Sequence, residues 1–386
     1  MKVILVTSYM KSKGGIARYV GGFAKYLASQ NDQVIIASLY ADKNLYKYEK
    51  GINIVDLADE KTLPQSIQFW LNLKKLQKKF SDLVANEKPD VILFNDFPAT
   101  LWARKFSGIP VLCYTYDIHM LYTNTYINNL PIITRWLWRI IRILIRIYDK
   151  KKWNCFNQII TDCNFMSKYI AKTYKKTTDV IYVGTDTKIF SPPENCSKKR
   201  SILAMGDLKV RRADFVLEAC GKLSKKRKDF KIWVVGNKGQ DDIILRKLVK
   251  KYNLEDMVEY FGTINDDSKL ARIYAESLVL CYLVKESAFG LTAAEAMACQ
   301  TPVIAWKPSG LEELIEDGIT GFNIEENNYE ILTKHIEKFL DNPKLSTEMG
   351  KRARLRVQNF VERDEKFREL RDLLESWVTR INQSDG

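Results

Sequence analysis

The feature that most limits the fold of this chain is a series of short apolar runs that alternate with helical segments. The first run, Val3–Val6, is followed by a glycine-containing loop and a helical stretch that reaches Leu27. A continuously apolar run of this kind is typical of a parallel strand buried on both faces of its sheet. Further runs follow at residues 34–37, 52–55, 90–94 and 111–114, with a long helix expected around Ile67 to Glu87. This alternation predicts a parallel, doubly wound α/β sheet.

A second series of the same kind begins near residue 202. Its runs lie at residues 202–205, 232–235, 258–261, 278–280 and 303–305, and Gly206, Gly236 and Gly262 follow the first three. With 386 residues, the chain exceeds the roughly 250–300 residues at which a single core stops growing. A polar, proline-bearing joint near residues 190–200 would separate two doubly wound domains, residues 1–190 and 200–360, with a cleft between them.

The composition narrows the class of partner. A net charge of +14 and a pI near 9.2 indicate acidic partners, which could be phosphorylated small molecules, anionic lipid or nucleic acid. Seven cysteines are scattered singly, so neither a disulfide framework nor a zinc site is expected, and a reducing cytoplasm fits best. The apolar start is too short for a signal peptide, and without an apolar run of about 18 residues no membrane-spanning helix is expected.

The stretch at residues 285–306 gives the strongest indication of a ligand site. The loop Phe289-Gly290-Leu291-Thr292 precedes residues that are mostly strong helix formers. A glycine at the mouth of a helix lets a ligand approach the backbone, where first-turn amides and the helix dipole attract a phosphate. Glu295, about one turn further, would accept hydrogen bonds from both hydroxyls of a ribose. The alternative is a packing helix with one solvated glutamate, and this segment alone leaves both interpretations open.

A weaker glycine signal lies near the start of the chain. Gly14 and Gly15 precede the helix that begins near Ile16. Such a pair could admit a phosphate or a sugar to the helix N-terminus, but it lacks the GxGxxG spacing, so nicotinamide binding is disfavoured.

Polar residues follow two strands of the first series, at the edge where doubly wound sheets bind ligands. Asp96 follows the strand at residues 90–94, and Tyr116, Asp117 and His119 follow the next strand. We interpret His119 as an active-site group, although a lone histidine is more often structural. The second histidine of the chain, at position 335, has charged neighbours on a helix and is expected at the surface.

Arg211 and Arg212 follow the first strand of the second series, where a helix is about to begin. This position suits charge-assisted contacts with a diphosphate, and the alternative is a solvated basic turn. No Asp-x-Asp pair occurs in the chain, so the usual carboxylate clamp for a metal ion bound to a nucleotide sugar is missing. Positive side chains and helix dipoles would have to stabilise the leaving diphosphate instead.

A basic, apolar helix is expected at residues 134–147. Arg135, Arg139, Arg142 and Arg146 recur on one face, with Trp, Ile and Leu on the others, and three lysines follow at residues 150–152. This combination describes an amphipathic helix on anionic lipid. An ordinary helix packed on the sheet, with a solvated arginine stripe, explains the pattern equally well.

Taken in order along the chain, several blocks resemble the retaining glycosyltransferases of family four, which have the GT-B fold. The blocks lie at residues 14–19, 180–190, 206–217, 289–305, 309–314 and 317–322. The resemblance implies two facing Rossmann-like domains with a deep interdomain cleft. It also implies a donor bound mainly by the second domain, an acceptor bound by the first, and a crossover helix at about residues 361–386 that returns to the first domain.

The resemblance assigns roles to individual residues. Glu295 matches the ribose-binding glutamate of the family, Arg212 its phosphate-binding basic residue, and Gly15 the N-terminal loop near the donor phosphate. The residues expected to bind the donor are Gly14, Gly15, Gly206, Arg211, Arg212, Gly236, Ser287, Phe289, Gly290, Leu291, Thr292 and Glu295.

The chain departs from the family pattern at three places. The family usually has two glutamates separated by seven residues, but counting back from Glu295 places Ser287 at the first position and leaves Glu286 one residue early. Asp207 stands after Gly206, where the family commonly has an arginine. This second departure places more weight on the two arginines that follow.

The third departure concerns the active-site histidine. Tyr116-Asp117 fills its usual register, and His119 comes later. Either a loop shift brings His119 into place or Asp117 has taken part of its role. We therefore expect catalytic roles for His119, Asp117 and Glu286.

We expect this chain to transfer a sugar, with retention, from a UDP- or GDP-linked donor to a hydroxyl of a lipid-linked or growing surface polysaccharide or glycolipid. Residues 134–153 would contact an anionic membrane from the cytoplasmic side. We expect no metal ion, no further cofactor and no nucleic acid partner. Two alternatives are a sugar-nucleotide epimerase of the same architecture and a non-enzymatic membrane-associated binding protein.

Overall fold

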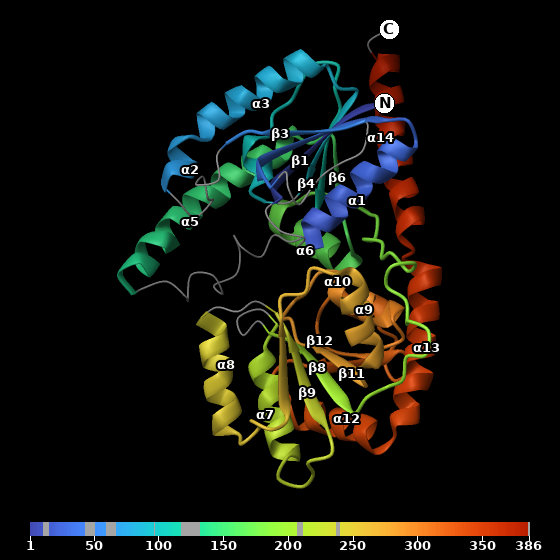
Figure 1. The fold of residues 1–386 in the computed structure, drawn as a ribbon. Helices are drawn as coiled ribbons and strands as arrows, with labels where there is room; N and C mark the ends of the chain where they lie inside the picture. The colour runs from blue at the N-terminus through green and yellow to red at the C-terminus, as the bar shows by residue number, and fades with distance from the viewer. Residues whose placement is uncertain are drawn as a thin grey trace. The chain divides into compact units, whose positions relative to one another are not determined.

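The computed structural model describes residues 1–10, 15–42, 51–58, 67–95, 97–116, 132–206, 211–236 and 240–384. It divides into two compact units (Figure 1). The first consists of Met1–Tyr182 and Lys366–Gly386, and the second of Val183–Glu365. Each unit is built around its own parallel sheet, as the α/β expectation required.

Within the described residues, the first unit contains a seven-stranded sheet in the order β3-β2-β1-β4-β5-β6-β7, and its strand pairs are parallel. Its strands are β1 (Lys2–Met10), β2 (Gln33–Ala41), β3 (Ile52–Asp56), β4 (Val91–Asn95), β5 (Val111–Thr115), β6 (Gln158–Thr161) and β7 (Asp179–Val180). The strand order reverses between β1 and β4. In open α/β sheets, ligands bind beyond the carboxyl ends of the strands at such a reversal.

The helices of the first unit are α1 (Gly15–Ser29), α2 (Ile67–Leu71), α3 (Leu73–Glu87), η1 (Ala99–Trp102), α5 (Ile132–Lys152), η3 (Trp153–Cys155) and α6 (Asn164–Tyr174). The single helix expected around residues 67–87 is therefore two helices that break at Asn72. Both contribute to one core, because Phe69 of α2 and Phe80 of α3 pack with Phe94 of β4.

Among the residues described in the second unit, six strands form a sheet in the order β10-β9-β8-β11-β12-β13. They are β8 (Ser201–Met205), β9 (Lys231–Val235), β10 (Val258–Gly262), β11 (Val279–Tyr282), β12 (Val303–Lys307) and β13 (Gly321–Glu325). The helices are α7 (Ala213–Leu223), α8 (Gln240–Lys251), α9 (Asp267–Glu276), α10 (Leu291–Ala298), α11 (Leu311–Leu314), α12 (Tyr329–Asp341) and α13 (Pro343–Phe360). Here the order reverses between β8 and β11, so the carboxyl ends of these two strands are neighbours.

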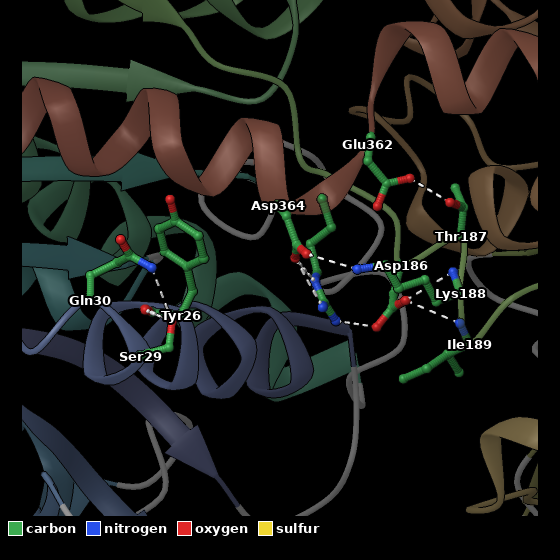
Figure 2. Close-up of polar contacts among 10 residues, drawn as sticks. Tyr26, Ser29, Gln30, Asp186, Thr187, Lys188, Ile189, Glu362 and Asp364 are labelled. Carbon is green, nitrogen blue, oxygen red and sulfur yellow. Dashed lines mark hydrogen bonds and ion pairs between the residues drawn. The ribbon is translucent and has the colours of Figure 1, made fainter.

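The two units meet along the sequence at residues 182–190 and 361–366, and both segments are tied together inside the second unit. Figure 2 shows the Thr187 hydroxyl donating to Glu362, and the Asp186 carboxylate accepting from the amides of Lys188 and Ile189. Arg363 forms an ion pair with Asp186. These contacts explain why the second unit begins at Val183, before the proline-bearing stretch expected as the joint.

Helix α14 (Arg363–Ser384) starts in the second unit and continues in the first. Its Phe367 ring lies 5.3 Å from both the Tyr19 and the Phe23 ring centroids of α1. Arg371 donates to the buried Asp32 carboxylate at 2.8 Å. The last helix therefore completes the core of the unit in which the chain began.

In the part of the chain that the structure describes, no helix is both long and apolar enough to cross a bilayer.

Candidate functional site

The residues expected to bind a ligand in the second unit lie beyond the carboxyl ends of β8, β9 and β11. Arg211 follows β8, whereas Ser287, Gly290 and Glu295 follow β11. Because β8 and β11 are adjacent where the strand order reverses, parallel strands deliver both loops to one edge of the sheet.

Glu295 is a buried carboxylate in the second turn of α10. Its exposed fraction is 4%, and it accepts a hydrogen bond of 3.2 Å from the Tyr274 hydroxyl of α9. Burial raises the pKa of the neighbouring Cys299 thiol, and the Glu295 charge raises it further. This burial excludes the simple alternative of a solvated glutamate on a packing helix. An ionised carboxylate in such a place needs hydrogen-bond donors to offset its lost hydration.

Tyr282, the last residue of β11, connects three of the expected site residues. Burial raises the pKa of its hydroxyl; the Arg211 charge and a hydrogen bond with Ser287 lower that pKa, and the Glu295 charge raises it. The structure thus brings Arg211, Ser287 and Glu295 around one phenol. A positive, a neutral polar and a negative group are thus neighbours at the end of the strand, where Ser287 and Glu295 are buried.

The loop before α10 contributes its backbone. Gly290 occupies the N-cap with a φ of 78°, and a Cβ there would lie 2.8 Å from Leu311 Cδ2, so both conformation and space require glycine. The amide of Ala293 already donates to Gly290 O, which leaves the amides of Leu291 and Thr292 ahead of the helical ladder. Phe289 is fully buried, so its side chain belongs to the core.

Arg212 has different surroundings from Arg211. It caps α7 with a φ of 50°, and its guanidinium donates to both Asp214 carboxylate oxygens, at 3.0 and 2.8 Å. The same group lies 4.2 Å from the centroid of the Phe215 ring. A bidentate pair stacked on an aromatic ring holds Arg212 in place at the start of α7.

Gly206 and Gly236 lie next to each other at the ends of β8 and β9. Gly206 N donates to Val235 O at 2.7 Å, and a Cβ on Gly236 would lie 3.0 Å from Gly206 N. Close backbone packing therefore accounts for both glycines at this edge of the sheet.

The first residues of the β11–α10 loop carry the departure from the glutamate spacing. Glu286 has a φ of 48° and is half-buried, whereas Ser287 is buried and its carbonyl accepts from Gly310 N at 2.8 Å. Because the backbone adopts a left-handed conformation at Glu286, the two side chains have different surroundings. Ser287 lies with Arg211 and Glu295 around the Tyr282 hydroxyl, a group that we call the Tyr282 cluster, whereas Glu286 lies one residue earlier in the loop.

In the first unit, Gly14, Asp117 and His119 lie outside the described residues, and Gly15 is the first residue of α1. The described end of the neighbouring strand is well anchored. Tyr116 donates to Asn95 Oδ1 at 2.8 Å, and its ring lies 5.3 Å from that of Tyr19.

The second histidine is less exposed than its sequence neighbours suggested. The His335 ring stacks on Phe322, with centroids 3.8 Å apart, and burial lowers its pKa. The expectation of a surface histidine was wrong in this respect, because α12 turns His335 toward β13.

Two tyrosines of the second unit were not anticipated. Tyr282 could have been suspected, because it ends an apolar run, but Tyr274 lies 21 positions before Glu295 on another helix. No local pattern indicates such a contact. Within the described ranges, no group of three or more His, Cys, Asp or Glu side chains is placed to hold a metal ion.

Comparisons with known proteins cover almost the whole chain. The family described as Glycosyltransferase Family 4 matches residues 13–189, and the family described as Glycosyl transferases group 1 matches residues 186–356. An uncharacterized glycosyltransferase of Haemophilus influenzae is 26% identical over 357 residues, which are 90% of this chain and 93% of that protein.

Solved structures share the fold. Sucrose-phosphate synthase of Thermosynechococcus elongatus matches 98% of this chain and 99% of its own, with a TM-score of 0.81 at 19% identity. HepE of Anabaena, in complex with UDP and glucose, matches 97% of this chain and 100% of its own, with a TM-score of 0.76 at 15% identity. The two-unit architecture expected from the sequence is thus the one these proteins have.

Proposed function

The chain belongs to the family-four glycosyltransferases and has the GT-B fold, and from that premise we propose that it transfers a sugar, with retention, from a nucleotide diphosphate donor to an acceptor hydroxyl. The observation that carries the donor half of this proposal is the buried Glu295 carboxylate one turn beyond the Gly290 loop. HepE, which has the same fold, binds UDP and glucose. We propose a UDP- or GDP-linked sugar as the donor here.

Different groups at this edge of the sheet would bind different parts of the donor. The Leu291 and Thr292 amides and the α10 dipole would bind the diphosphate. Arg211 would add a charge-assisted contact to the diphosphate. Arg212, which is paired with Asp214, would stabilise the start of α7. Glu295 would accept from the ribose hydroxyls, which are donors that a buried carboxylate needs.

The chemistry we propose for these groups is positioning and charge stabilisation. The bond between the anomeric carbon and the diphosphate breaks as the acceptor oxygen attacks from the same face, and the departing phosphate oxygen takes the acceptor proton. The amides and Arg211 would stabilise the negative charge that develops on the diphosphate. No flanking carboxylate pair is needed, in contrast to a glycoside hydrolase. We propose that the reaction uses no metal ion.

The half-buried Glu286 and the buried Ser287 are candidates for contacts to the transferred sugar. Ser287 already takes part in the Tyr282 cluster, so its hydroxyl is held close to Glu295 and Arg211. We propose that Ser287 orients the sugar and that Glu286 contributes from the mouth of the loop. Asp117 and His119 remain proposed for the acceptor side.

A donor screen tests this function. The protein is incubated with UDP- and GDP-sugars and a lipid extract, and released nucleoside diphosphate is measured. We expect release that depends on the extract and is lost in Glu295→Ala, but is retained in Glu348→Ala, which changes an exposed glutamate of α13. An isomerised donor formed without acceptor would instead identify an epimerase, an alternative that the comparisons do not support. Unchanged turnover in Glu295→Ala would overturn the assignment of the donor site.

A second proposal concerns α5, which carries exposed apolar side chains among basic ones. Ile143, Leu144 and Ile147 are 54%, 64% and 51% exposed, whereas Ile145 is buried. The side chains of residues 132–138 and 140 lie outside the described residues, so Arg135 is not placed. A packed helix with a solvated arginine stripe would hide its isoleucines, so these exposures favour a lipid surface.

The basic residues of α5 are close to one another. Burial lowers the pKa of Arg142, and the charges of Arg146 and Arg139 lower it further. Lys150 and Lys151 extend the positive charge at the end of the helix. We propose that α5 binds an anionic membrane surface from the cytoplasmic side, and that the acceptor is a lipid-linked saccharide or growing surface polysaccharide.

Co-sedimentation with vesicles tests the membrane proposal. Binding should require anionic lipid and should be lost when Arg139, Arg142 and Arg146 are changed to glutamate. A matched control changes Lys247, Lys250 and Lys251 of α8 to glutamate, with the same change in net charge, and should bind normally. Equal binding by both variants would overturn the proposal.

A further inference from the structure

The buried face of α9 offers a contact that the proposed donor chemistry has not used. Tyr274 is fully buried, and its hydroxyl donates to Glu295 Oε2 at 3.2 Å. A buried tyrosine hydroxyl needs a hydrogen-bond partner, and a carboxylate is the strongest acceptor a side chain supplies. Glu295 is thereby held from the side of α9.

The backbone of Tyr274 is fixed as well. Its carbonyl accepts from the Thr301 hydroxyl, in the turn that follows α10. Thr301 Oγ1 in turn accepts from Lys198 Nζ at 2.8 Å, and the same ammonium donates to Ser277 O at 2.7 Å, just past the end of α9. The end of α9 and the turn after α10 are therefore joined by side chains as well as by packing.

We propose that Tyr274 is a positioning residue for the ribose: its hydroxyl holds the Glu295 carboxylate in the orientation in which the carboxylate accepts from the ribose hydroxyls. Thr301 and Lys198 support Tyr274 from its backbone. This inference rests on the proposed function, because it assigns Glu295 to the ribose. It adds a residue that the family resemblance did not assign in this chain.

The physical reason is the freedom of a glutamate side chain. Three rotatable bonds separate its carboxylate from the backbone, and fixing such a side chain costs conformational entropy. Because the Tyr274 hydroxyl orients the carboxylate before the nucleotide binds, this entropy is lost on folding and not on binding. A neutral hydroxyl also leaves the charge of Glu295 intact, whereas an arginine in its place would neutralise the carboxylate.

Lys198 supports the same arrangement. Burial lowers its pKa to about 7. Since lysine in the unfolded chain titrates near 10.4, folding releases a proton between about pH 7 and pH 10, and this residue's contribution to stability rises with pH over that window. An amine kept in so unfavourable a site, with two oxygen acceptors, indicates that the α9–α10 connection is specific.

Tyr274→Phe tests the proposal, since it keeps the ring in the core and removes the hydroxyl. Calorimetry would compare UDP with 2′,3′-dideoxy-UDP, or the guanine pair if the donor screen selects GDP. We expect Tyr274→Phe to weaken UDP binding by about 10-fold and to leave the dideoxy nucleotide within about twofold, because only UDP offers ribose hydroxyls to Glu295.

Tyr252→Phe is the matched control, because the Tyr252 hydroxyl also donates to a carboxylate, that of Glu218 at 3.1 Å, elsewhere in the second unit. It should alter neither affinity. Equal losses for both nucleotides in Tyr274→Phe would indicate a merely structural residue and overturn the inference, as would no loss for either. Wild-type protein that binds neither UDP nor GDP would overturn the proposed function, and this inference with it.

Discussion

Helices α10 and α5 depart in opposite directions from the rule that charged side chains lie outside and apolar ones inside. The eight-residue α10 buries the Glu295 carboxylate to 4% exposure. The 21-residue α5 leaves Ile143, Leu144 and Ile147 about half exposed or more. Helix α10 thus buries a charged group away from water, whereas α5 leaves apolar side chains exposed to water.

The comparison teaches that each departure from the rule has a free-energy cost for which a physical reason must be found. A buried carboxylate costs free energy unless donors surround it, and exposed isoleucines lose burial that the core could have used. Helix α5 also carries a departure that is purely internal. Asp149 is buried, and it accepts from Tyr174 and Thr100 inside the first unit. The proposals above explain the first two departures by a ligand and a membrane, whereas contacts within the first unit explain the third.

The largest effect should follow Glu295→Gln. The amide keeps the size of the side chain and an acceptor for Tyr274, but loses charge and gains donors that face the ribose. We expect kcat/KM for the donor to fall about 10- to 100-fold, which corresponds to about 1.5–3 kcal/mol for hydrogen bonds to a charged group.

Urea unfolding of the same variant distinguishes function from stability. Because the substitution removes a buried charge, the second unit should be as stable as wild type or more stable. A variant that loses activity and stability together would mean that Glu295 serves the fold, and the contrast between α10 and α5 would then fail.

Asp149→Asn should give the next largest effect, and on stability alone. Burial raises the Asp149 pKa to about 6. Since an unfolded aspartate ionises near 3.9, its ionisation between about pH 4 and pH 6 favours the unfolded chain, so this contribution to stability falls as pH rises through that window. Relative to wild type, Asp149→Asn should gain about 2–3 kcal/mol between pH 4 and pH 7, measured from urea midpoints.

Donor KM should stay at the wild-type value in Asp149→Asn. A stability difference from wild type that is the same at about pH 4 and at about pH 7 would show that this carboxylate is not the group that titrates.

The smallest effect is expected when Ile143, Leu144 and Ile147 of α5 are changed together to serine. Their exposed area contributes little to folding, so thermal stability should change by only a few tenths of a kcal/mol. Partition onto anionic vesicles should fall by about 10-fold, because apolar insertion adds to the electrostatic attraction. Ile189→Ser, which alters an exposed isoleucine of the second unit, is the control. Unchanged vesicle binding would contradict this prediction and would show that only the positive charge of α5 attracts it to the vesicle.

The fold was largely predictable because its signal is local and repeated. Each apolar run needs a layer on both faces, and alternation with helices leaves a parallel sheet as the solution. The break at Asn72 was not predictable, since the residues on both sides of it favour helix. The start of the second unit at Val183 was missed too, because it depends on contacts with Glu362 and Arg363, far along the chain.

The candidate site was predictable only as a set of positions. The resemblance matches Arg212 to the phosphate-binding basic residue, and the structure adds that Arg212 pairs with Asp214 while Arg211 interacts with Tyr282. Spacing along the chain could not show that the two adjacent arginines have different partners, because these contacts depend on the backbone at the left-handed N-cap, Arg212, and on the position of β11.

The sequence by itself determined the two doubly wound sheets, the family and the helix that carries Glu295, because periodicity, glycine positions and motif order are properties of neighbouring residues. Only the tertiary structure decided that Glu295 is buried against Tyr274, that Ser287 and Arg211 interact with the Tyr282 hydroxyl, and that Ile143, Leu144 and Ile147 of α5 are exposed. Burial and hydrogen-bond partners depend on which distant elements pack together, and free energies of desolvation follow from that packing.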